Sequence, residues 1–438
     1  MRAAVALGNS LIPGRPSESD DDPERGRRRN GGRAGSGERG VTEILSSIEF
    51  QMSLLLFVAL AGYLIASRIN QSAVIGEILV GVLVGPSVLG LITYTDFVQS
   101  LAHLGAIFLL FTIGFEFCIS DLTDPRYLGI AFVGVVLPWI GGYLSTAMLG
   151  YPTASALFVG TALTATSIAI TANVLKELGH LDTPAAKAII GAAVIDDVLS
   201  LLVLGLTTDV IRGSLSIPTL ATSLVGAVLF IGMGLLVGIK IVSPLLAALD
   251  RRPLARQYPE FVFITALAIA FLYAMTAELI GLSAIVGAFI AGVSCRDITL
   301  CHSKDPREGA EYLQVVFAAI FFVSLGIIVD LRALTPAIAV LVAVITLVAI
   351  ATKLIGCGLP ARLFGYTRRE AAVIGFGMAP RGEVAMIVAL IGLNQGVIGQ
   401  EIFVAILLMS LVTTVITPVI FQNWLFRPAS GSDTELAA

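Results

Sequence analysis

Charged residues and cysteines are both scarce in this chain of 438 residues. Only 13% of its residues are charged and 56% are hydrophobic, which is far from the balance of a soluble domain. The four cysteines form no disulfide pattern, and Cys295, Cys301 and His302 near one loop are too few ligands for a zinc site. These absences argue against a soluble enzyme, a disulfide-rich secreted domain and a structural zinc protein, and we expect no cofactor.

The chain is instead rich in apolar runs of about 20 residues, each long enough to cross roughly 30 Å of hydrocarbon. Their apolar character is continuous and does not alternate, which favours helices over barrel strands. The sequence therefore predicts an all-α polytopic membrane protein with thirteen transmembrane helices. The expected spans are 48–66, 73–92, 101–119, 127–149, 154–176, 186–211, 217–242, 259–275, 277–293, 313–331, 337–361, 371–393 and 399–421.

The two ends of the chain differ in composition from the region between them. Residues 1–47 are expected to be a disordered tail and lead-in, because Gly, Arg, Ser, Asp and Pro dominate the first forty. This tail lacks the apolar stretch of a signal peptide. We expect a transmembrane domain over residues 48–425 and a short C-terminal tail over 426–438.

Lysine and arginine are unevenly distributed between alternate loops. The loops after odd-numbered spans carry fourteen, whereas those after even-numbered spans carry only Arg212 and Arg332. The positive-inside rule then predicts an N-terminus outside and a C-terminus in the cytoplasm. The arginine-rich first forty residues would lie on the wrong side, and a translation start near Val41 or Met52 would remove this conflict.

Two short motifs recur at nearly one spacing. The sequence from Ser72 to Gly81 is echoed from Ser283 to Gly292, an offset of 211 residues. The sequence LFTIG ending at Gly114 resembles FVSLG ending at Gly326, an offset of 212 residues. Together these matches indicate an internal repeat that pairs spans 1–6 with spans 8–13.

Such a repeat predicts opposite orientations for its halves, because seven crossings separate equivalent helices. The expected units are residues 48–211, a linker helix over 217–242 and residues 259–421. Inverted repeats are typical of secondary transporters, which bind their substrates where helices are broken near the midplane. Breaks are expected at 161–167, which is rich in Thr and Ser, and at 375–383, which is rich in Gly and contains Pro380.

Two adjacent acids, Asp196 and Asp197, lie within the apolar run 189–206. A carboxylate at mid-membrane costs about 2.5–3.5 kcal/mol on insertion scales, so the pair predicts an ion or proton site. Neighbouring side chains on a helix diverge by about 100°, so the two acids need not share one role. The cation available at similar depth is Lys353, unless its side chain extends to an interface. For the other acids in apolar segments, structural pairing or interface exposure is favoured over transport: Glu77, Glu116 and Glu278.

Four motifs resemble those of bacterial monovalent cation/proton antiporters in the sodium/hydrogen exchanger superfamily. They are Gly76 to Gly81 with the following Gly85-Pro86-Ser87, Phe111 to Glu116, the pair Asp196-Asp197, and Pro380-Arg381-Gly382-Glu383. The resemblance implies a fold of crossed, discontinuous helices, with a mobile core of spans 4–6 and 11–13 and a dimer-forming panel from the other spans. The Asp-Asp pair resembles the electrogenic branch.

The resemblance also implies roles for individual residues. Asp197 would carry the transported Na⁺ or the proton, with Asp196 beside it as a further metal ligand and the partner of Lys353. The ion pocket would include Thr164, Thr166 and Ser167. The broken twelfth span would be stabilised by Pro380, Arg381 and Glu383.

The expected function is exchange of Na⁺ or Li⁺ for H⁺ by alternating access in a prokaryotic plasma membrane. Its partners would be the cation, the proton, the lipid bilayer and a second copy in a homodimer, with no nucleic acid. Only residues 427–438 follow the last span, so we expect no gating through an appended nucleotide-binding domain.

Four alternatives compete with this function. Three stay open: a K⁺/H⁺ antiporter of the same family, a sodium-coupled solute symporter and a cation channel. The sequence does not distinguish K⁺ from Na⁺, because pocket geometry selects the size of the cation. A di-aspartyl intramembrane protease is disfavoured, since its two acids must approach one peptide bond from separate helices.

Overall fold

The computed structural model describes residues 47–426 apart from 70, 118–123, 214–216, 297, 299 and 301–302. By its internal contacts the chain divides into residues 1–50 and residues 51–438, and the helix packing below concerns the second part. The described residues form helices joined by turns and contain no strand, which confirms the all-α prediction.

Helices begin and end as follows. The first half contains α2 (Ile48–Arg68), α3 (Ala73–Val84), α4 (Asp96–Gly114), α5 (Pro125–Met148), α6 (Thr153–Ala162), α7 (Ile168–Glu177) and α8 (Pro184–Arg212). The middle contains α9 (Ile217–Val237), η2 (Gly238–Val242), α10 (Ser243–Asp250) and α11 (Pro253–Gln257). The second half contains α12 (Phe261–Leu279), α13 (Ala284–Cys295), α14 (Pro306–Ile327), η3 (Leu331–Ala333), α15 (Pro336–Leu363), α16 (Arg368–Gly377), α17 (Glu383–Asn394), α18 (Gln400–Ile420) and η4 (Phe421–Leu425).

Nine helical stretches in the described part of the chain are long and apolar enough to cross a membrane, so this is an integral membrane protein. Four shorter apolar helices accompany them: Ala73–Val84, Thr153–Ala162, Ala284–Cys295 and Val384–Asn394. The total of thirteen spans stays a prediction, because these shorter helices do not cross by length alone.

Capping side chains define where several of these helices start. Thr183 and Thr335 accept a hydrogen bond from a backbone N–H of the first turn of α8 and α15, and each helix then begins with proline. Such a cap satisfies one of the donors that a helix N-terminus leaves free, and proline has no N–H to lose there. Threonine followed by proline therefore marks these starts in the sequence.

Several predicted boundaries were wrong. The second span was expected to reach residue 92, but α3 ends at Val84 because Gly85 and Pro86 interrupt it. The division expected between residues 275 and 277 lies later, since α12 continues to Leu279 and the turn falls at Gly281, whose φ is +88°. The linker helix expected to end at 242 continues through η2 into α10.

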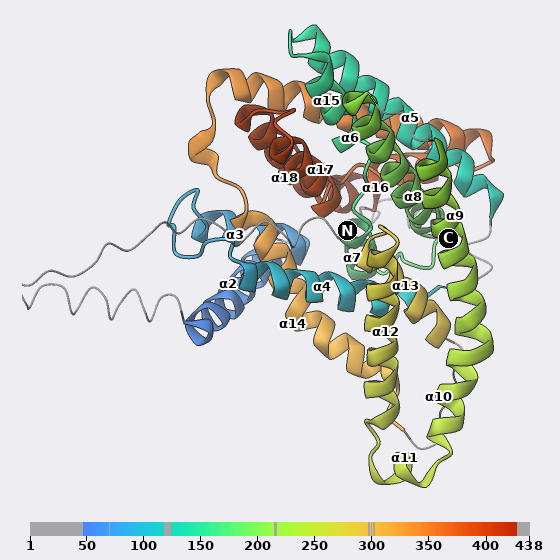
Figure 1. Cartoon of the computed structure of the whole chain (residues 1–438). Coiled ribbons are helices and arrows are strands. Elements are labelled where there is room, and N and C mark those ends of the chain that lie inside the picture. The colour runs from blue at the N-terminus through green and yellow to red at the C-terminus, as the bar shows by residue number, and fades with distance from the viewer. Residues whose placement is uncertain are drawn as a thin grey trace, which may run out of the picture. The chain divides into compact units, whose positions relative to one another are not determined.

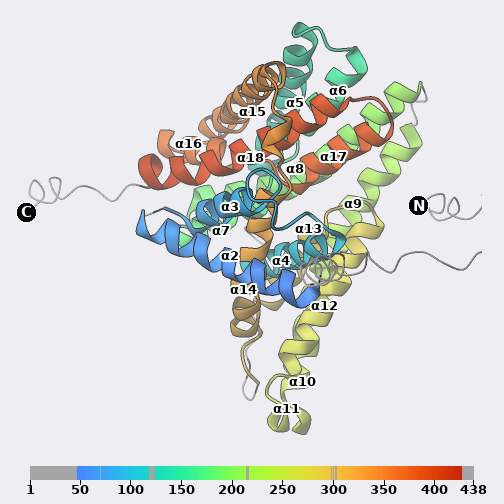
Figure 2. The ribbon, with the colours of Figure 1, turned by 90° about the vertical axis from the view of Figure 1, so that its left-hand side faces the viewer.

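The helices of residues 51–438 pack mainly within two groups (Figures 1 and 2). We call α5–α8 with α15–α18 the core, in which α5 lies along α15, and α6 along α17. We call α3, α4 and α12–α14 the panel, in which α4 packs on both α13 and α14. Contacts between the groups include those of α4 with α7 and of α3 with α18.

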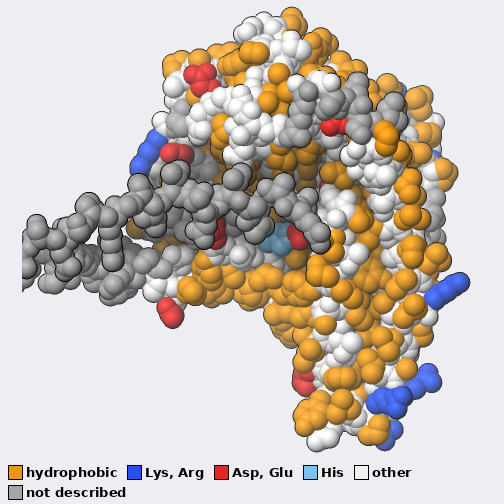
Figure 3. Space-filling model, in the orientation of Figure 1, with side chains coloured by type: hydrophobic (Ala, Val, Ile, Leu, Met, Phe, Trp, Pro, Cys, Tyr) orange, Lys and Arg blue, Asp and Glu red, His pale blue; other side chains and the backbone are white. Residues whose placement is uncertain are grey.

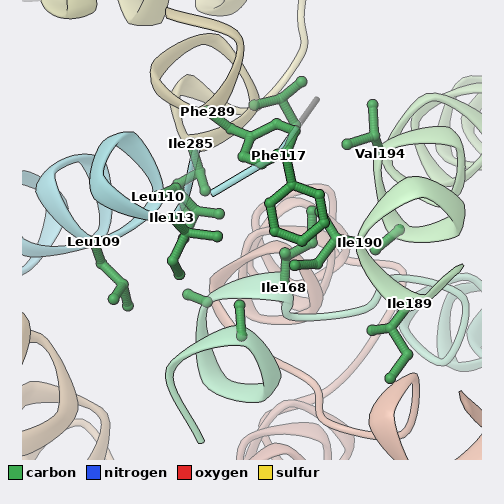
Figure 4. Close-up of a cluster of buried hydrophobic side chains, with 14 of the residues drawn as sticks. Leu109, Leu110, Ile113, Phe117, Ile168, Ile189, Ile190, Val194, Ile285 and Phe289 are labelled. Carbon is green, nitrogen blue, oxygen red and sulfur yellow. The ribbon is translucent and has the colours of Figure 1, made fainter. Parts of the chain in front are cut away.

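Buried apolar side chains fill the boundary between these groups (Figure 4). Ile113 of α4 and Phe289 of α13 face Ile168 of α7 and Val194 of α8, with Phe117 between them. Hydrophobic side chains also dominate the face seen in Figure 3, as expected for contact with lipid, whereas Lys and Arg gather around α10 and α11.

Candidate ion-binding site

Two helix breaks meet inside the core. The break between α6 and α7 contacts the break between α16 and α17, because Ser167 N donates to Pro380 O at 2.9 Å. The Thr171 hydroxyl donates to Gly377 O at 2.6 Å, which satisfies a carbonyl at the end of α16. The two interrupted helices therefore supply hydrogen-bond partners to each other, as broken helices in a membrane require.

The predicted pocket residues of the first break lie at this crossing. Thr164 is fully buried and donates to Thr161 O at 2.7 Å, and Thr166 donates to Met378 O at 3.3 Å. The Ser167 hydroxyl is buried and has no hydrogen-bond partner among the described residues. The structure thus places all three residues at the first break, where the Ser167 hydroxyl is the one without a hydrogen-bond partner in the described part of the chain.

Asp196 forms a buried ion pair with Lys353. Lys353 Nζ lies 2.7 Å from Asp196 Oδ1, and both residues are 0% exposed. The second carboxylate oxygen, Oδ2, has no hydrogen-bond partner within the described part of the chain. Lys353 therefore does not extend to the membrane interface, and α15 delivers its ammonium to the middle of α8.

Asp197 points to a different neighbour, at the boundary between core and panel. Its Oδ2 accepts a hydrogen bond from the backbone N–H of Ser283 at 3.3 Å. Ser283 is the N-cap of α13, so this carboxylate lies at the positive end of a helix dipole. Asp197 is only partly buried, unlike Asp196. Sequence reasoning missed Ser283, although its place before an apolar helix is typical of a cap.

Arg381 holds the second break together from a fully buried position. Its Nη1 donates to Met378 O at 3.1 Å and to Ala379 O at 3.0 Å. Its own carbonyl accepts hydrogen bonds from Ser410 and Thr414 of α18. Two guanidinium nitrogens, Nε and Nη2, have no partner among the described residues. The α18 hydroxyls were also missed, and their grouping within an apolar span was the available signal.

The remaining acids in apolar segments behave differently from one another. Glu116 pairs with Arg307, and Glu278, which is half exposed, lies 3.2 Å from His103. These two fit the expectation of pairing or interface exposure. Glu77 is only 6% exposed and has neither a hydrogen bond nor an ion pair with any described residue, so it is not paired as expected.

Some predicted residues cannot be placed. Glu383 is the first residue of α17, and its side chain lies outside what the structure describes. Residues 1–46 of the predicted N-terminal tail and residues 427–438 of the predicted C-terminal tail lie outside the described residues, as do Cys118, Cys301 and His302.

Three charged side chains of the core are fully buried, namely those of Lys353, Arg381 and Asp196, and Asp197 is partly buried at the boundary with the panel. Arg381 is near enough for its charge to act on Asp196. Asp196 is therefore held by a cationic side chain, whereas Asp197 accepts a backbone hydrogen bond at the positive end of α13.

Comparison with known proteins shows to which family the chain belongs. The sequence profile described as "Sodium/hydrogen exchanger, transmembrane" matches residues 54–427. The chain belongs to the sodium/hydrogen exchanger family. The "Na(+)/H(+)-K(+) antiporter GerN" of Bacillus cereus is 35% identical over 378 residues, which cover 84% of this chain and 94% of that protein.

Two further proteins are similar to this chain over most of their length. The "High-affinity Na(+)/H(+) antiporter NhaS3" of Synechocystis is 30% identical, covering 90% of this chain and 92% of that protein. The solved sodium proton antiporter MjNhaP1 of Methanocaldococcus jannaschii at pH 8 matches with a TM-score of 0.65 and 17% identity. That match covers 85% of this chain and 95% of MjNhaP1, and it supports the fold alone.

Proposed function

We propose that this member of the sodium/hydrogen exchanger family exchanges Na⁺ or Li⁺ for H⁺ across the membrane by alternating access. The observation that carries the proposal is the separation of the two acids of α8. Asp196 is neutralised by Lys353 at 2.7 Å, whereas Asp197 faces the core–panel boundary and the end of α13. We assign the transported ion to Asp197, the acid at this boundary, and the ion pair with Lys353 to Asp196.

Competition for Asp197 couples the two flows. A carboxylate holding a proton cannot hold a metal ion as well, so the core moves either protonated or loaded with cation. The unpaired Ser167 hydroxyl and the carbonyls of the first break supply further oxygen ligands, which are the type that alkali cations prefer. Thr164 and Thr166 shape this pocket through hydrogen bonds to nearby carbonyls.

The cycle would move net charge if two protons enter for each Na⁺ expelled. One elementary charge crossing the membrane is worth about 2.3 kcal/mol per 100 mV. Lys353 is the group that can release the second proton when Asp196 changes partner. Pro380, Arg381 and Glu383 keep the second break in shape and take no part in ion exchange.

The two inverted six-helix repeats remain part of this proposal, and crosswise packing supports them. Gly81 of α3 lies against Val323 and Gly326 of α14, and Gly292 of α13 lies against Phe111 and Gly114 of α4. Adding 211 to the number of Gly81 gives Gly292, and adding 212 to those of Phe111 and Gly114 gives Val323 and Gly326. Each contact is therefore the counterpart of the other in the repeat. The orientation with the N-terminus outside, the plasma-membrane location and the homodimer are proposed on the same basis.

The test is proton flux in proteoliposomes, followed with a pH-sensitive dye while Na⁺, Li⁺ and K⁺ are added in turn. Asp197→Asn should reduce cation-dependent flux to the level of protein-free vesicles, because the amide cannot take up a proton. Arg332→Gln is the matched control. Arg332 lies in η3, outside the helix that carries the acid pair, so this variant should keep the flux.

Flux that persists in Asp197→Asn would remove this residue from the mechanism. K⁺-driven flux equal to the Na⁺-driven flux would instead support potassium exchange, which the printed name of GerN includes for that protein. Flux that depends on an added organic solute would indicate a symporter.

A further inference from the structure

A second carboxylate of the core is held by the panel, at the far end of α7 from the helix break. Glu177 Oε2 accepts a hydrogen bond from the Ser72 hydroxyl at 2.6 Å. The backbone N–H of Ala73 also donates to this carboxylate. Ser72 is the N-cap of α3, so Glu177 lies at the positive end of a panel helix.

Other side chains of the last turns of α7 fix this contact in place. Asn173 donates to Glu177 Oε1 at 2.9 Å, which leaves both carboxylate oxygens bonded. Lys176 donates to Gln314 of α14 at 2.9 Å and lies 3.8 Å from Glu311 of the same helix. The end of α7 is thereby hydrogen-bonded to two panel helices, α3 and α14.

The contact between Ser72 and Glu177 has a counterpart in the second half of the chain. Ser72 and Ser283 are equivalent residues of the repeated motif, 211 positions apart. Ser72 is the N-cap residue of α3 and its hydroxyl donates to Glu177, whereas Ser283 is the N-cap residue of α13 and its backbone N–H donates to Asp197. In each half, the start of the same panel helix therefore holds one carboxylate of the core.

We propose that Ser72 and Glu177 form a latch between core and panel that opens and closes during transport, as the counterpart of the contact between Ser283 and Asp197. This inference rests on the proposed alternating access and adds Glu177 as a positioning residue, because it does not contact the ion. Under the proposed topology, the loops next to α7 are cytoplasmic, so the latch closes the cytoplasmic side. The core cannot slide along the panel while Glu177 stays bonded to the start of α3.

A reducible bridge across the latch tests whether it must open. Ser72→Cys and Glu177→Cys are combined in a chain whose four native cysteines are replaced by serine, and a short bis-methanethiosulfonate reagent links them. Bridging should reduce exchange in proteoliposomes to the level of protein-free vesicles, and a reductant should restore it. The matched control joins Ser87→Cys to Val329→Cys, which follow the panel helices α3 and α14. Ser87 Oγ lies 2.7 Å from the backbone oxygen of Val329, and this variant should transport ions while bridged.

Full exchange by protein that mass spectrometry shows to be completely bridged would overturn the latch. Absence of flux in the unbridged and native chains would instead count against the proposed function. A readout independent of transport is therefore included, namely hydrogen–deuterium exchange of the native chain and of Glu177→Ala. The amides of 72–77 and 172–178 should exchange about tenfold faster in the variant, and unchanged protection of both segments would also overturn the latch.

Discussion

The adjacent residues Asp196 and Asp197 have different surroundings because helix geometry turns them to different sides of α8. One side chain faces α15, where Lys353 is buried, and the other faces the N-terminus of α13. A buried ion pair contributes little net stability, but removing one partner leaves an uncompensated charge that costs about 3–5 kcal/mol. We therefore expect Asp196 to keep its charge while it is paired with Lys353, and Asp197 to be the acid that changes its charge.

Lys353→Met should lower the thermal stability of the purified protein, since it leaves Asp196 buried without a counter-charge. The expected loss is about 3–5 kcal/mol, measured as a fall in the midpoint of thermal unfolding in detergent. The double variant Lys353→Met with Asp196→Asn should recover most of this loss, because no unpaired charge remains.

The same two variants test the transport role of the pair. The double variant should exchange cations without moving net charge, as measured by currents on a solid-supported membrane. Unchanged charge movement in this stable variant would exclude Lys353 from proton transfer.

At the scale of elements, the crossing depends on close approach of two backbones. A Cβ built on Gly382 would lie 2.6 Å from Ser167 Oγ and 2.8 Å from Ser167 Cβ, which is closer than side-chain atoms can approach. Gly382 therefore allows the second break to lie against the first. The hydrogen bond from Ser167 N to Pro380 O depends on the same approach.

Gly382→Ala should push the breaks apart and weaken cation binding by roughly 10-fold to 100-fold, the range typical of groups that support metal ligands. Apparent affinity is measured from the Na⁺ dependence of proton flux. Gly399→Ala is the control, because no atom lies within 4 Å of the added carbon, and its affinity should match that of the native chain. Equal affinity in both variants would show that the approach at Gly382 does not shape the ion site.

At the scale of the whole molecule, the two halves of the proposed repeat cross the membrane in opposite orientations. The uneven distribution of Lys and Arg between loops predicts which side of the membrane each loop faces. Arg251, Arg252 and Arg256 are exposed near α10 and α11, where basic side chains gather in Figure 3. The positive-inside rule places that end in the cytoplasm. The loop before α15, with the exposed Leu334, should then lie outside.

Labelling of intact cells tests this orientation. Single cysteines at Leu334→Cys and Arg252→Cys, in the cysteine-free background, are treated with a membrane-impermeant maleimide. Only the first should react in intact cells, and both should react after permeabilisation. Reaction of Arg252→Cys alone in intact cells would reverse the proposed topology.

Local signals predicted much of the fold, and they failed where a turn depends on one residue. The breaks expected at 161–167 and 375–383 include the observed interruptions between α6 and α7 and between α16 and α17. The ends of the second and eighth spans were wrong, since hydropathy continues past Gly85 and past the division expected near residue 276. Hydropathy does not distinguish apolar residues that continue a helix from apolar residues that lie in the turn after it.

The sequence by itself determined that the chain is helical, lies in a membrane, and carries an acid pair, a lysine in an apolar span and two interrupted helices, because each feature follows from residue type and local order. Only the tertiary structure decided that Lys353 is buried against Asp196, that Ser283 binds Asp197, and that Ser72 binds Glu177. Those contacts join residues separated by 86 to 157 positions, and their geometry depends on how the helices cross.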